Sequence, residues 1–299
     1  MSLFVQLLLN GIVSGSIYAL MAVGFALIFG ATRHFHISHA AIFSSAGYLT
    51  LIFSINLGLP GGLAAIAAIV AAVLLGVFIV RFLYVPLNKR GGGGFSLFLA
   101  SLGALTVLDN VFTMGLGARP AKPSLGSWFT AVQTFGPWSM TWGQIVVVVL
   151  TFVMFISLVL AVERTKSGKL IKAYSGNPEF FQVFGRRPMV VLILVYAIGS
   201  LFAAIAGIYI ATDVGMQPGL GERFFIVSIM AVFIGGIGSL RGAFIAAMAL
   251  GVLQNLLLLV MGAQWTLAAV FFVFLVFITW SPQGLQGLQS ILQKRRTLA

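Results

Sequence analysis

The side chains best suited to chemistry in this chain of 299 residues gather in one short stretch, RHFHISHAAIF. It holds all three histidines of the chain, His34, His36 and His39. On a helix His34 and His36 would diverge, whereas His36 and His39 could share a face. A metal site usually needs three or four ligands, and no carboxylate or thiol lies nearby in the sequence. We therefore expect no metal site here, and a loop whose His and Arg side chains lie at the level of lipid headgroups.

The residues that follow this loop begin an apolar segment. Ser38 is predicted to cap the helix, because a serine hydroxyl can accept a hydrogen bond from a free backbone N–H. His39 would then enter the protein interior. A lone polar side chain in that position is a candidate for a substrate pathway.

Other polar side chains also lie inside apolar segments, where they are costly. The strongest candidate is Asp109, some two thirds of the way along its segment and followed by Asn110. Tyr18 is a weaker candidate of the same kind, as are Asn10, Gln254 and Asn255. The alternative for each is a structural hydrogen bond to a neighbouring helix.

Sequence motifs of enzymes are absent. The tetrapeptide SGKL at 167–170 has the Gly-Lys pair of a nucleotide-binding loop but lacks the upstream Gly and the following Ser or Thr. Nothing resembles a nucleophile elbow, and the chain has no cysteine. We expect a protein that is not an enzyme and needs no cofactor; if ATP is used, another chain binds it.

The composition defines the class of protein. Hydrophobic residues make up 60% of the chain and charged residues 7%, with a mean hydropathy of +1.11. These values are typical of a polytopic membrane protein rather than a soluble domain. The net charge of +12 would suggest nucleic acid as a partner of a soluble protein, but here its placement matters more.

The pattern predicts an all-α transmembrane bundle with eight to nine spans, in a single domain over residues 1–299. A span needs roughly 20 apolar residues. Seven segments qualify: 4–30, 38–57, 62–84, 95–116, 142–162, 189–211 and 264–281. The region 224–261 is interrupted by FIGGIGSLRGAF, so two shorter segments fit best there. The first of them is short enough to be a half-helix buried in protein.

Basic residues orient the bundle. With the N-terminus outside, all but Arg119, Lys122 and Arg223 of the 17 Lys and Arg fall on the inner face, a strong positive-inside signal. The excess charge therefore reflects topology, and no nucleic-acid partner is expected. Two connections are long: an outer loop at 117–141, rich in Gly, Pro and Trp, and a polar inner loop at 163–188.

The inner loop contains a short helix signal, SGNPEFFQVFG. Asn177 suits an N-cap, Pro178 the first turn, Glu179 the positive end of the helix dipole, and Gly185 a left-handed stop. Its body carries Phe180, Phe181, Val183 and Phe184, more apolar surface than a short connection needs. The residues leave two functions open: a helix lying on lipid, or a knob that docks on another protein.

Several motifs together resemble the permeases of branched-chain amino acid ABC transporters. The segments that carry the resemblance are LLNGIVSGSIYALMAVGFALIFG, FHISHAAIFSSAGY, ASLGALTVLDNVF, TKSGKLIKAYSGNPEFFQVFG and GERFFIVSIMAVFIGGIGSLRGAF. They cover nearly the whole chain, in the family's order. The resemblance places His39 on the family histidine and implies that residues 176–184 couple the permease to an ATPase, with Gly176, Asn177, Pro178, Glu179, Phe180, Phe181 and Phe184 at the contact.

The resemblance also implies an assembly and a location. A family member is an importer subunit in the bacterial inner membrane. Its partners are a paralogous permease or a second copy of itself, two ATP-binding subunits and a periplasmic substrate-binding protein. The expected cargo is a branched-chain amino acid or a related small amino acid, amide or organic acid. His36, Ala40 and Ala41 depart from the family pattern and could alter the cargo. The alternative function is a self-sufficient ion-coupled transporter with its ion site at Asp109.

Overall fold

The protein is a bundle of long helices with one small hairpin. The computed structural model describes residues 2–117, 119–282 and 284–285. Its helices are α1 (Ser2–Thr32), α2 (Ser38–Leu51), α3 (Gly61–Phe78), α4 (Val85–Lys89), α5 (Gly94–Leu116), α6 (Ser127–Thr130), α7 (Trp142–Arg164), α8 (Lys166–Gly176), α9 (Pro178–Val183), α10 (Pro188–Asp213), α11 (Leu220–Gly235), α12 (Leu240–Leu256) and α13 (Ala263–Trp280). Two π-helical turns, η1 (Ile52–Asn56) and η2 (Ile79–Tyr84), extend α2 and α3, and a 3₁₀ turn, η3 (Leu257–Leu259), follows α12.

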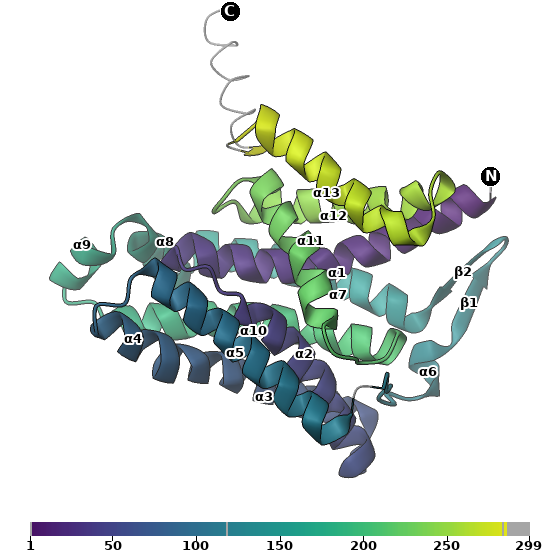
Figure 1. The fold of residues 1–299 in the computed structure, drawn as a ribbon, viewed down its shortest axis with the longest axis horizontal. Helices are drawn as coiled ribbons and strands as arrows, with labels where there is room; N and C mark the ends of the chain where they lie inside the picture. The colour runs from purple at the N-terminus through teal and green to yellow at the C-terminus, as the bar shows by residue number, and fades with distance from the viewer. Residues whose placement is uncertain (1, 118, 283, 286–299) are drawn as a thin grey trace, which may run out of the picture.

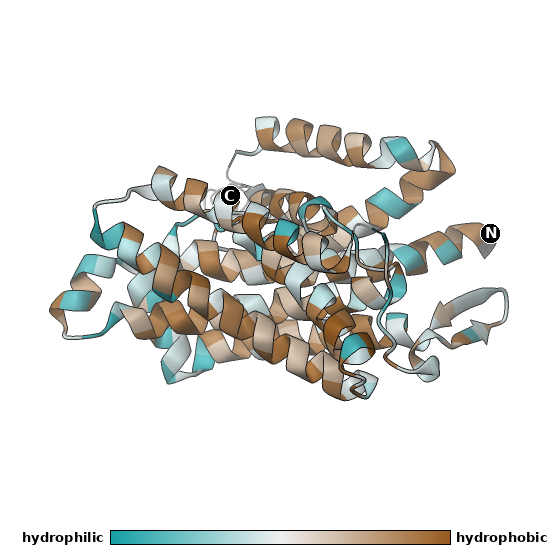
Figure 2. Ribbon diagram, turned by 60° about the horizontal axis from the view of Figure 1, so that its bottom comes forward, coloured by the Kyte–Doolittle hydropathy of each residue, from teal (hydrophilic) through white to brown (hydrophobic). Residues whose placement is uncertain are grey.

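Eight helical segments are long and apolar enough to cross a membrane. This confirms the predicted polytopic helical bundle. Figure 1 shows most long helices running side by side, with α8 and α9 at one end and the hairpin near the N-terminus at the other. Colouring by hydropathy shows apolar residues along the shafts of the helices and polar residues mainly at the ends (Figure 2). We call the end with α8 and α9 the inner end and the end with the hairpin the outer end.

The helices divide into a central group and a peripheral group. In the most apolar stretch of α1, 83% of the residues are buried, whereas the value is 17% for α5 and α7 and 11% for α13. Helices α10, α11 and α12 pack against α1, and α2 packs against α10. Because apolar side chains remain exposed along the peripheral helices, these helices offer their outer faces to lipid or to another apolar surface.

Helices α1 and α12 touch through their backbones at glycine residues, and we call this line of contact the glycine seam. A Cβ added to Gly251 would lie 2.2 Å from the backbone nitrogen of Gly15, and one added to Gly11 would lie 2.7 Å from Val252 Cα. Only glycine fits such an approach. The small-residue pair Gly11 and Gly15 therefore lets α1 and α12 run in direct backbone contact.

The region after α10 is broken into two helices, as the sequence predicts. Helix α11 begins at Leu220, four residues before the predicted start, directly after Gly219, which has a φ of +76°. It ends at Gly235, and Gly236 and Gly238, with φ of +96° and +87°, turn the chain into α12. With 16 residues α11 is not among the eight long spans.

Helix α11 still carries the chain from one end of the bundle to the other. Before it, Met216 pairs with Ala121 of the outer loop through two backbone hydrogen bonds. After it, Gly238 lies against Gly30 at the inner end of α1. The irregular segment 214–219 connects α10 to α11 at the outer end, with Gly215 and Met216 buried and Val214 and Pro218 exposed.

The outer loop is more ordered than the sequence predicts. It forms α6 and an antiparallel hairpin, β1 (Val132–Phe135) and β2 (Trp138–Thr141), in which Val132 pairs with Thr141 and Phe135 with Trp138. The side chain of Gln6 on α1 accepts a hydrogen bond from the Ser139 backbone and donates one to its carbonyl. The hairpin is thereby fixed to the outer end of α1. At the C-terminus, the basic residues Lys294, Arg295 and Arg296, assigned above to the inner face, lie outside the described residues.

Candidate functional site

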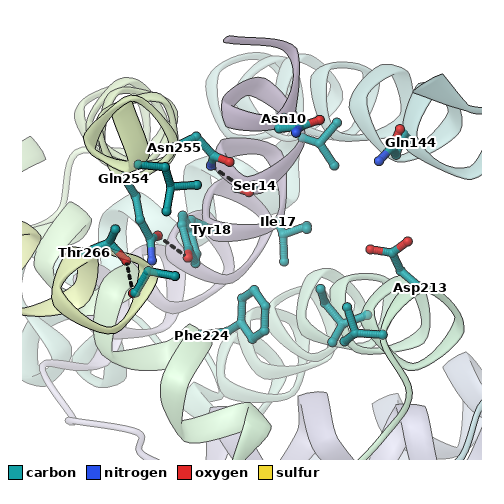
Figure 3. A pocket seen from close by; sticks show the side chains of 15 residues that line it. Asn10, Ser14, Ile17, Tyr18, Gln144, Asp213, Phe224, Gln254, Asn255 and Thr266 are labelled. Carbon is teal, nitrogen blue, oxygen red and sulfur yellow. Dashed lines mark hydrogen bonds between the residues drawn. The ribbon is translucent and has the colours of Figure 1, made fainter. Parts of the chain in front are cut away.

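A cavity of about 410 Å³ opens at the outer half of the bundle, lined by both polar and apolar side chains. Its wall is built by α1, α7, α10, α11, α12, η3 and α13, so segments far apart in the sequence contribute to it. Figure 3 shows the side chains that point into it. We call this space the outer cavity.

Three hydrogen bonds organise one side of the outer cavity. The Tyr18 hydroxyl donates to Gln254 Oε1 at 2.5 Å, and Asn255 Nδ2 donates to Ser14 Oγ at 3.1 Å (Figure 3). Asn255 also donates to the Gly251 carbonyl on its own helix. Both side-chain bonds join α1 to α12 beside the glycine seam. The backbone contact at that seam brings polar groups far apart in sequence within hydrogen-bond distance.

The opposite side of the outer cavity has a different chemistry. Asp213 from α10 and Gln144 from α7 lie on this side, and Asp213 is the only charged residue among the described residues that line the cavity (Figure 3). Apolar side chains, chiefly Ile17 and Phe224, lie between the two polar sides. A space with separated polar groups and an apolar surface between them suits a small amphiphilic solute.

The predicted pathway residues do not all meet at this cavity. Tyr18 lines it, together with the weaker candidates Asn10, Gln254 and Asn255. Asp109 and Asn110 lie on α5, outside the lining. Asp109 Oδ2 accepts a hydrogen bond from the backbone N–H of Gly219 at 3.2 Å, directly before α11. Asn110 is exposed and donates to the Thr106 carbonyl of its own helix.

The histidine stretch is buried, so the prediction that its side chains lie at headgroup level is wrong for His36. Only Arg33 is exposed, and His36 has no accessible surface. His36 Nδ1 lies 2.8 Å from the Tyr84 hydroxyl, and its ring contacts Tyr196 at a centroid distance of 4.9 Å. Burial, together with the neighbouring His39 and His34, lowers the pKa of His36 well below its ordinary value of 6.5. Tertiary contacts cover a loop that looked peripheral in the sequence.

Ser38 does not cap α2, which corrects a second prediction. No side-chain cap is formed at this helix start, and Ile37 occupies the N-cap position. Instead the Ser38 hydroxyl donates to the Ser101 carbonyl at 2.7 Å, and the Ser38 backbone N–H donates to Ser101 Oγ at 2.8 Å. A partner on another helix has replaced the local capping bond because α5 lies against the start of α2.

His39 enters the interior but does not line the outer cavity. It has no accessible surface and lies among aromatic rings, with Phe225 at 5.8 Å and Phe25 at 6.4 Å between centroids. The Met21 carbonyl is near the ring, but neither ring nitrogen has a partner in hydrogen-bond geometry within the described residues. Among all the residues that the structure describes, no three His, Asp or Glu side chains come close enough to hold a metal ion.

Several lining residues were not predicted from the sequence. Gln144 resembles an ordinary part of a capping box, which it does form with Thr141 at the start of α7. Asp213 is the last residue of α10, where a charge is not unusual. Ser14, Phe224 and Thr266 carry no local signal. Of these, Asp213 carries the clearest signal, as an acid at the end of an apolar span, although Glu163 at the end of α7 has the same pattern.

The inner end carries a second feature, which we call the inner tip and define as residues 166–185. Here α8 and α9 meet at Asn177, whose Oδ1 accepts hydrogen bonds from the backbone N–H groups of Glu179 and Phe180, both at 3.0 Å. Pro178 occupies the first turn, and Gly185 has a φ of +68°. The predicted cap and left-handed stop are confirmed. The predicted helix is present, and α8 precedes it as an amphipathic helix that the sequence reading left unassigned.

The aromatic residues of the inner tip face two ways. Phe181 is 6% exposed and packs on Tyr174 of α8 with a centroid distance of 5.6 Å. Phe180, Val183 and Phe184 are 62%, 81% and 75% exposed. Gly176, the last residue of α8, leaves open space beside it. Phe181 thus fixes α9 to α8, whereas Phe180, Val183 and Phe184 are exposed on the surface of the inner tip.

Comparison with known proteins decides between the functions left open above. Residues 7–279 match the family model of the permease component of branched-chain amino acid transport systems. The chain belongs to this family. Membership supports a transmembrane permease subunit over a self-sufficient ion-coupled transporter, and the match covers every described residue that lines the outer cavity.

Individual relatives of the permease are distant but nearly full-length. The branched-chain amino acid permease protein BraD of Pseudomonas aeruginosa is 27% identical over 88% of this chain and 89% of its own length. LivH of Escherichia coli is 27% identical over 85% of each chain. The ribose import permease RbsC of the same species is 26% identical over 83% of this chain and 76% of its own length. These relatives are transport permeases, not enzymes.

Proposed function

We propose that this permease is a subunit of an ATP-driven importer in the bacterial inner membrane. It would pair with a paralogous permease or a second copy of itself, with two ATP-binding subunits and with a periplasmic substrate-binding protein. ATP would be hydrolysed on the separate ATP-binding chains. The family membership supports this assembly, because relatives carry transport names and the chain itself has no nucleotide-binding motif.

The exposed aromatic surface of the inner tip carries the proposal. Phe180 and Phe184 lie on a six-residue helix that Asn177 caps and Phe181 anchors, so the surface is held in a fixed orientation. Leaving large aromatic side chains in water is unfavourable by roughly 1.5 to 3 kcal/mol each relative to full burial. A groove on an ATP-binding subunit would bury them, and closure of that subunit would then move α8, which packs on α7, α1 and α10.

The outer cavity is the proposed site of the cargo. Tyr18 and the amide groups of its wall offer donors and acceptors, and Ile17 and Phe224 offer an apolar contact. His39, Asp109 and Asn110 lie off this wall; as pathway residues they remain proposals, and the nearest role for His39 is in the packing between α2 and α11. The names of the relatives support a branched-chain amino acid as cargo, with related small amino acids, amides and organic acids as alternatives.

The departures from the family pattern do not bear on this cavity. Ala40 and Ala41 are fully buried, and the Ala40 carbonyl lies where a Cβ on Gly221 would have to fit. His36 bonds to Tyr84. None of the three lines the outer cavity. They support close packing of α2 against α11 and α3, so they give no reason to exclude leucine, isoleucine or valine.

The test of the assembly is co-purification of the permease with its genetic neighbours. We expect the ATP-binding subunits to remain bound to the wild-type chain and to dissociate when Phe180→Glu and Phe184→Glu are combined. The matched control is Phe135→Glu, which changes a phenylalanine that is 55% exposed on the outer hairpin and should leave the complex intact. Retention of the ATP-binding subunits by the double variant would contradict the docking role. Uptake by this chain alone in liposomes under an ion gradient would contradict the importer.

A further inference from the structure

The charge of the outer cavity is opposite to that of the chain. The protein carries 17 Lys and Arg against five Asp and Glu, yet none of the lining residues is basic and Asp213 is acidic. The Asp213 carboxylate points into the cavity from the end of α10 (Figure 3). In a protein whose net charge is +12, the charge on the described lining of this cavity is thus negative.

The carboxylate of Asp213 is free to bind a ligand. Within the described ranges no group donates a hydrogen bond to it. Lys122, the nearby cation, donates to the backbone carbonyl of Asp213 instead and does not line the cavity. Asp213 is exposed and lines the cavity. A carboxylate on the wall of a cleft attracts cations and repels anions more strongly than one on an open surface.

The side chains opposite Asp213 limit which solutes can bind in the outer cavity. Gln254 and Asn255 lie on the opposite side of the cavity, with Ile17 and Phe224 between them and Asp213 (Figure 3). Amide groups can bind either a carboxylate or a hydroxyl of a ligand, because they both donate and accept. The arrangement fits a small solute with an ammonium group at one end, an apolar body, and a second polar group at the other end.

We propose that the outer cavity binds the ammonium group of a cationic or zwitterionic solute through Asp213, and that Asp213 excludes solutes bearing only negative charge. The proposal rests on the proposed function, because it assigns the substrate class of the same cavity. It removes the purely anionic organic acids from the range of cargo given above.

A charge-sensitive labelling experiment tests the field at the cavity. The chain has no native cysteine, so Leu258→Cys introduces a single thiol at the cavity wall, where the side chain is 41% exposed. The assembled importer is labelled with trimethylammonioethyl or with sulfonatoethyl methanethiosulfonate, and modification of this chain is followed by mass spectrometry. Because both reagents attack the thiolate, the ratio of their rates reports the local potential and not the reactivity of the thiol.

The ratio of cationic to anionic labelling should fall about tenfold when Asp213→Asn is added, since the two reagents carry opposite charges. Lys122→Gln should raise it. Val260→Cys is the matched control position, because Val260 is 83% exposed two residues away and does not line the cavity; Asp213→Asn should leave its ratio nearly unchanged. An unchanged ratio at Leu258→Cys would overturn the proposal.

A second experiment tests the ligand class with three probes that share a five-carbon skeleton. Labelling of Leu258→Cys by neutral N-ethylmaleimide is measured with isopentylammonium, isopentanol or isovalerate present at equal concentration. We expect isopentylammonium to slow labelling most and isovalerate least, and Asp213→Asn to abolish the difference. Equal slowing by all three, or none by any, would overturn the proposal.

These outcomes are independent of the test of the proposed function. If ATP-dependent uptake is found while Asp213→Asn leaves the labelling ratio unchanged, the proposed importer function is supported and the proposed role of Asp213 is wrong. If the ratio responds but the chain binds no ATP-binding subunit, the charge of the cavity stands and the assembly is wrong.

Discussion

The inner tip and the outer cavity are made in opposite ways. The inner tip is built from residues close in sequence: Asn177 caps the helix that begins one residue later, and Phe181 packs on Tyr174 only seven positions away. The outer cavity joins Tyr18 to Gln254 across 236 positions and adds residues from five further helical elements. Local rules therefore suffice for the surface that we propose to dock, whereas the space that we propose to hold the cargo exists only when the bundle is assembled.

The largest effect should come from breaking the seam on which the cavity depends. Gly251→Leu places a side chain within 2.3 Å of the Gly15 backbone, and neither helix can yield without separating α1 from α12. We expect loss of the folded bundle, because overpacking of this kind costs roughly 1 to 3 kcal/mol or more. The matched control is Gly103→Leu on α5, where nothing lies within 4 Å of the added Cβ. In size-exclusion chromatography in detergent, Gly103→Leu should elute as a single symmetric peak and Gly251→Leu should aggregate. A single symmetric peak for Gly251→Leu would show that the bundle does not depend on the contact between α1 and α12.

A second test uses His36, which lies in the short loop between α1 and α2 and is buried by residues distant in the sequence. Its pKa is lowered by burial, so the unfolded chain takes up a proton at a higher pH than the folded chain does. Stability should be constant above about pH 6.5 and fall as the pH drops below it, by up to about 1.4 kcal/mol per pH unit. Melting temperatures from pH 8 to pH 5 measure this.

The variants of the histidines show which residue causes the fall. His36→Gln should lessen the fall and leave a remainder from the equally buried His39, whereas His34→Gln, at a half-buried position of the same loop, should change the profile less. A wild-type melting temperature that rises on acidification to about pH 5 would contradict the burial of His36 in the neutral form.

A smaller effect is expected within the cavity itself. Tyr18→Phe removes the bond to Gln254 and leaves that amide without its partner, at a cost of about 1 kcal/mol. ATP-driven uptake should fall several-fold while the complex remains assembled. Tyr209→Phe serves as the control, because the Tyr209 hydroxyl has no partner among the described residues. Equal uptake by wild type and Tyr18→Phe would show that this hydrogen bond does not shape the pathway.

The smallest effect on global stability should come from the inner tip. Asn177→Ala removes the cap of α9, worth about 1 kcal/mol locally, but the bundle does not rest on this helix. The melting temperature should hardly change, while affinity for the ATP-binding subunits falls. Ser175→Ala, which removes an exposed bond to the Lys172 carbonyl, is the control. A large drop in melting temperature would mean that the inner tip is not a local unit.

The contrast also explains which sequence predictions succeeded. The cap at Asn177, the turn at Gly185 and the break at Gly236 were readable because each depends on a few neighbouring residues. Ser38 and His36 were misread because their partners, Ser101 and Tyr84, lie more than 40 positions away. A serine before a helix is a cap only when nothing closer satisfies it.

The sequence by itself determined that the protein is a helical membrane bundle, that the chain breaks near Gly236, and that the basic residues favour one end, because periodicity, glycine and charge act over short distances. Its motifs also pointed to the permease family. Only the tertiary structure decided that Tyr18, Gln254 and Asp213 face one cavity while His39 and Asp109 do not. The physical reason is that the faces of apolar helices look alike until backbone contact at glycine fixes which of them meet.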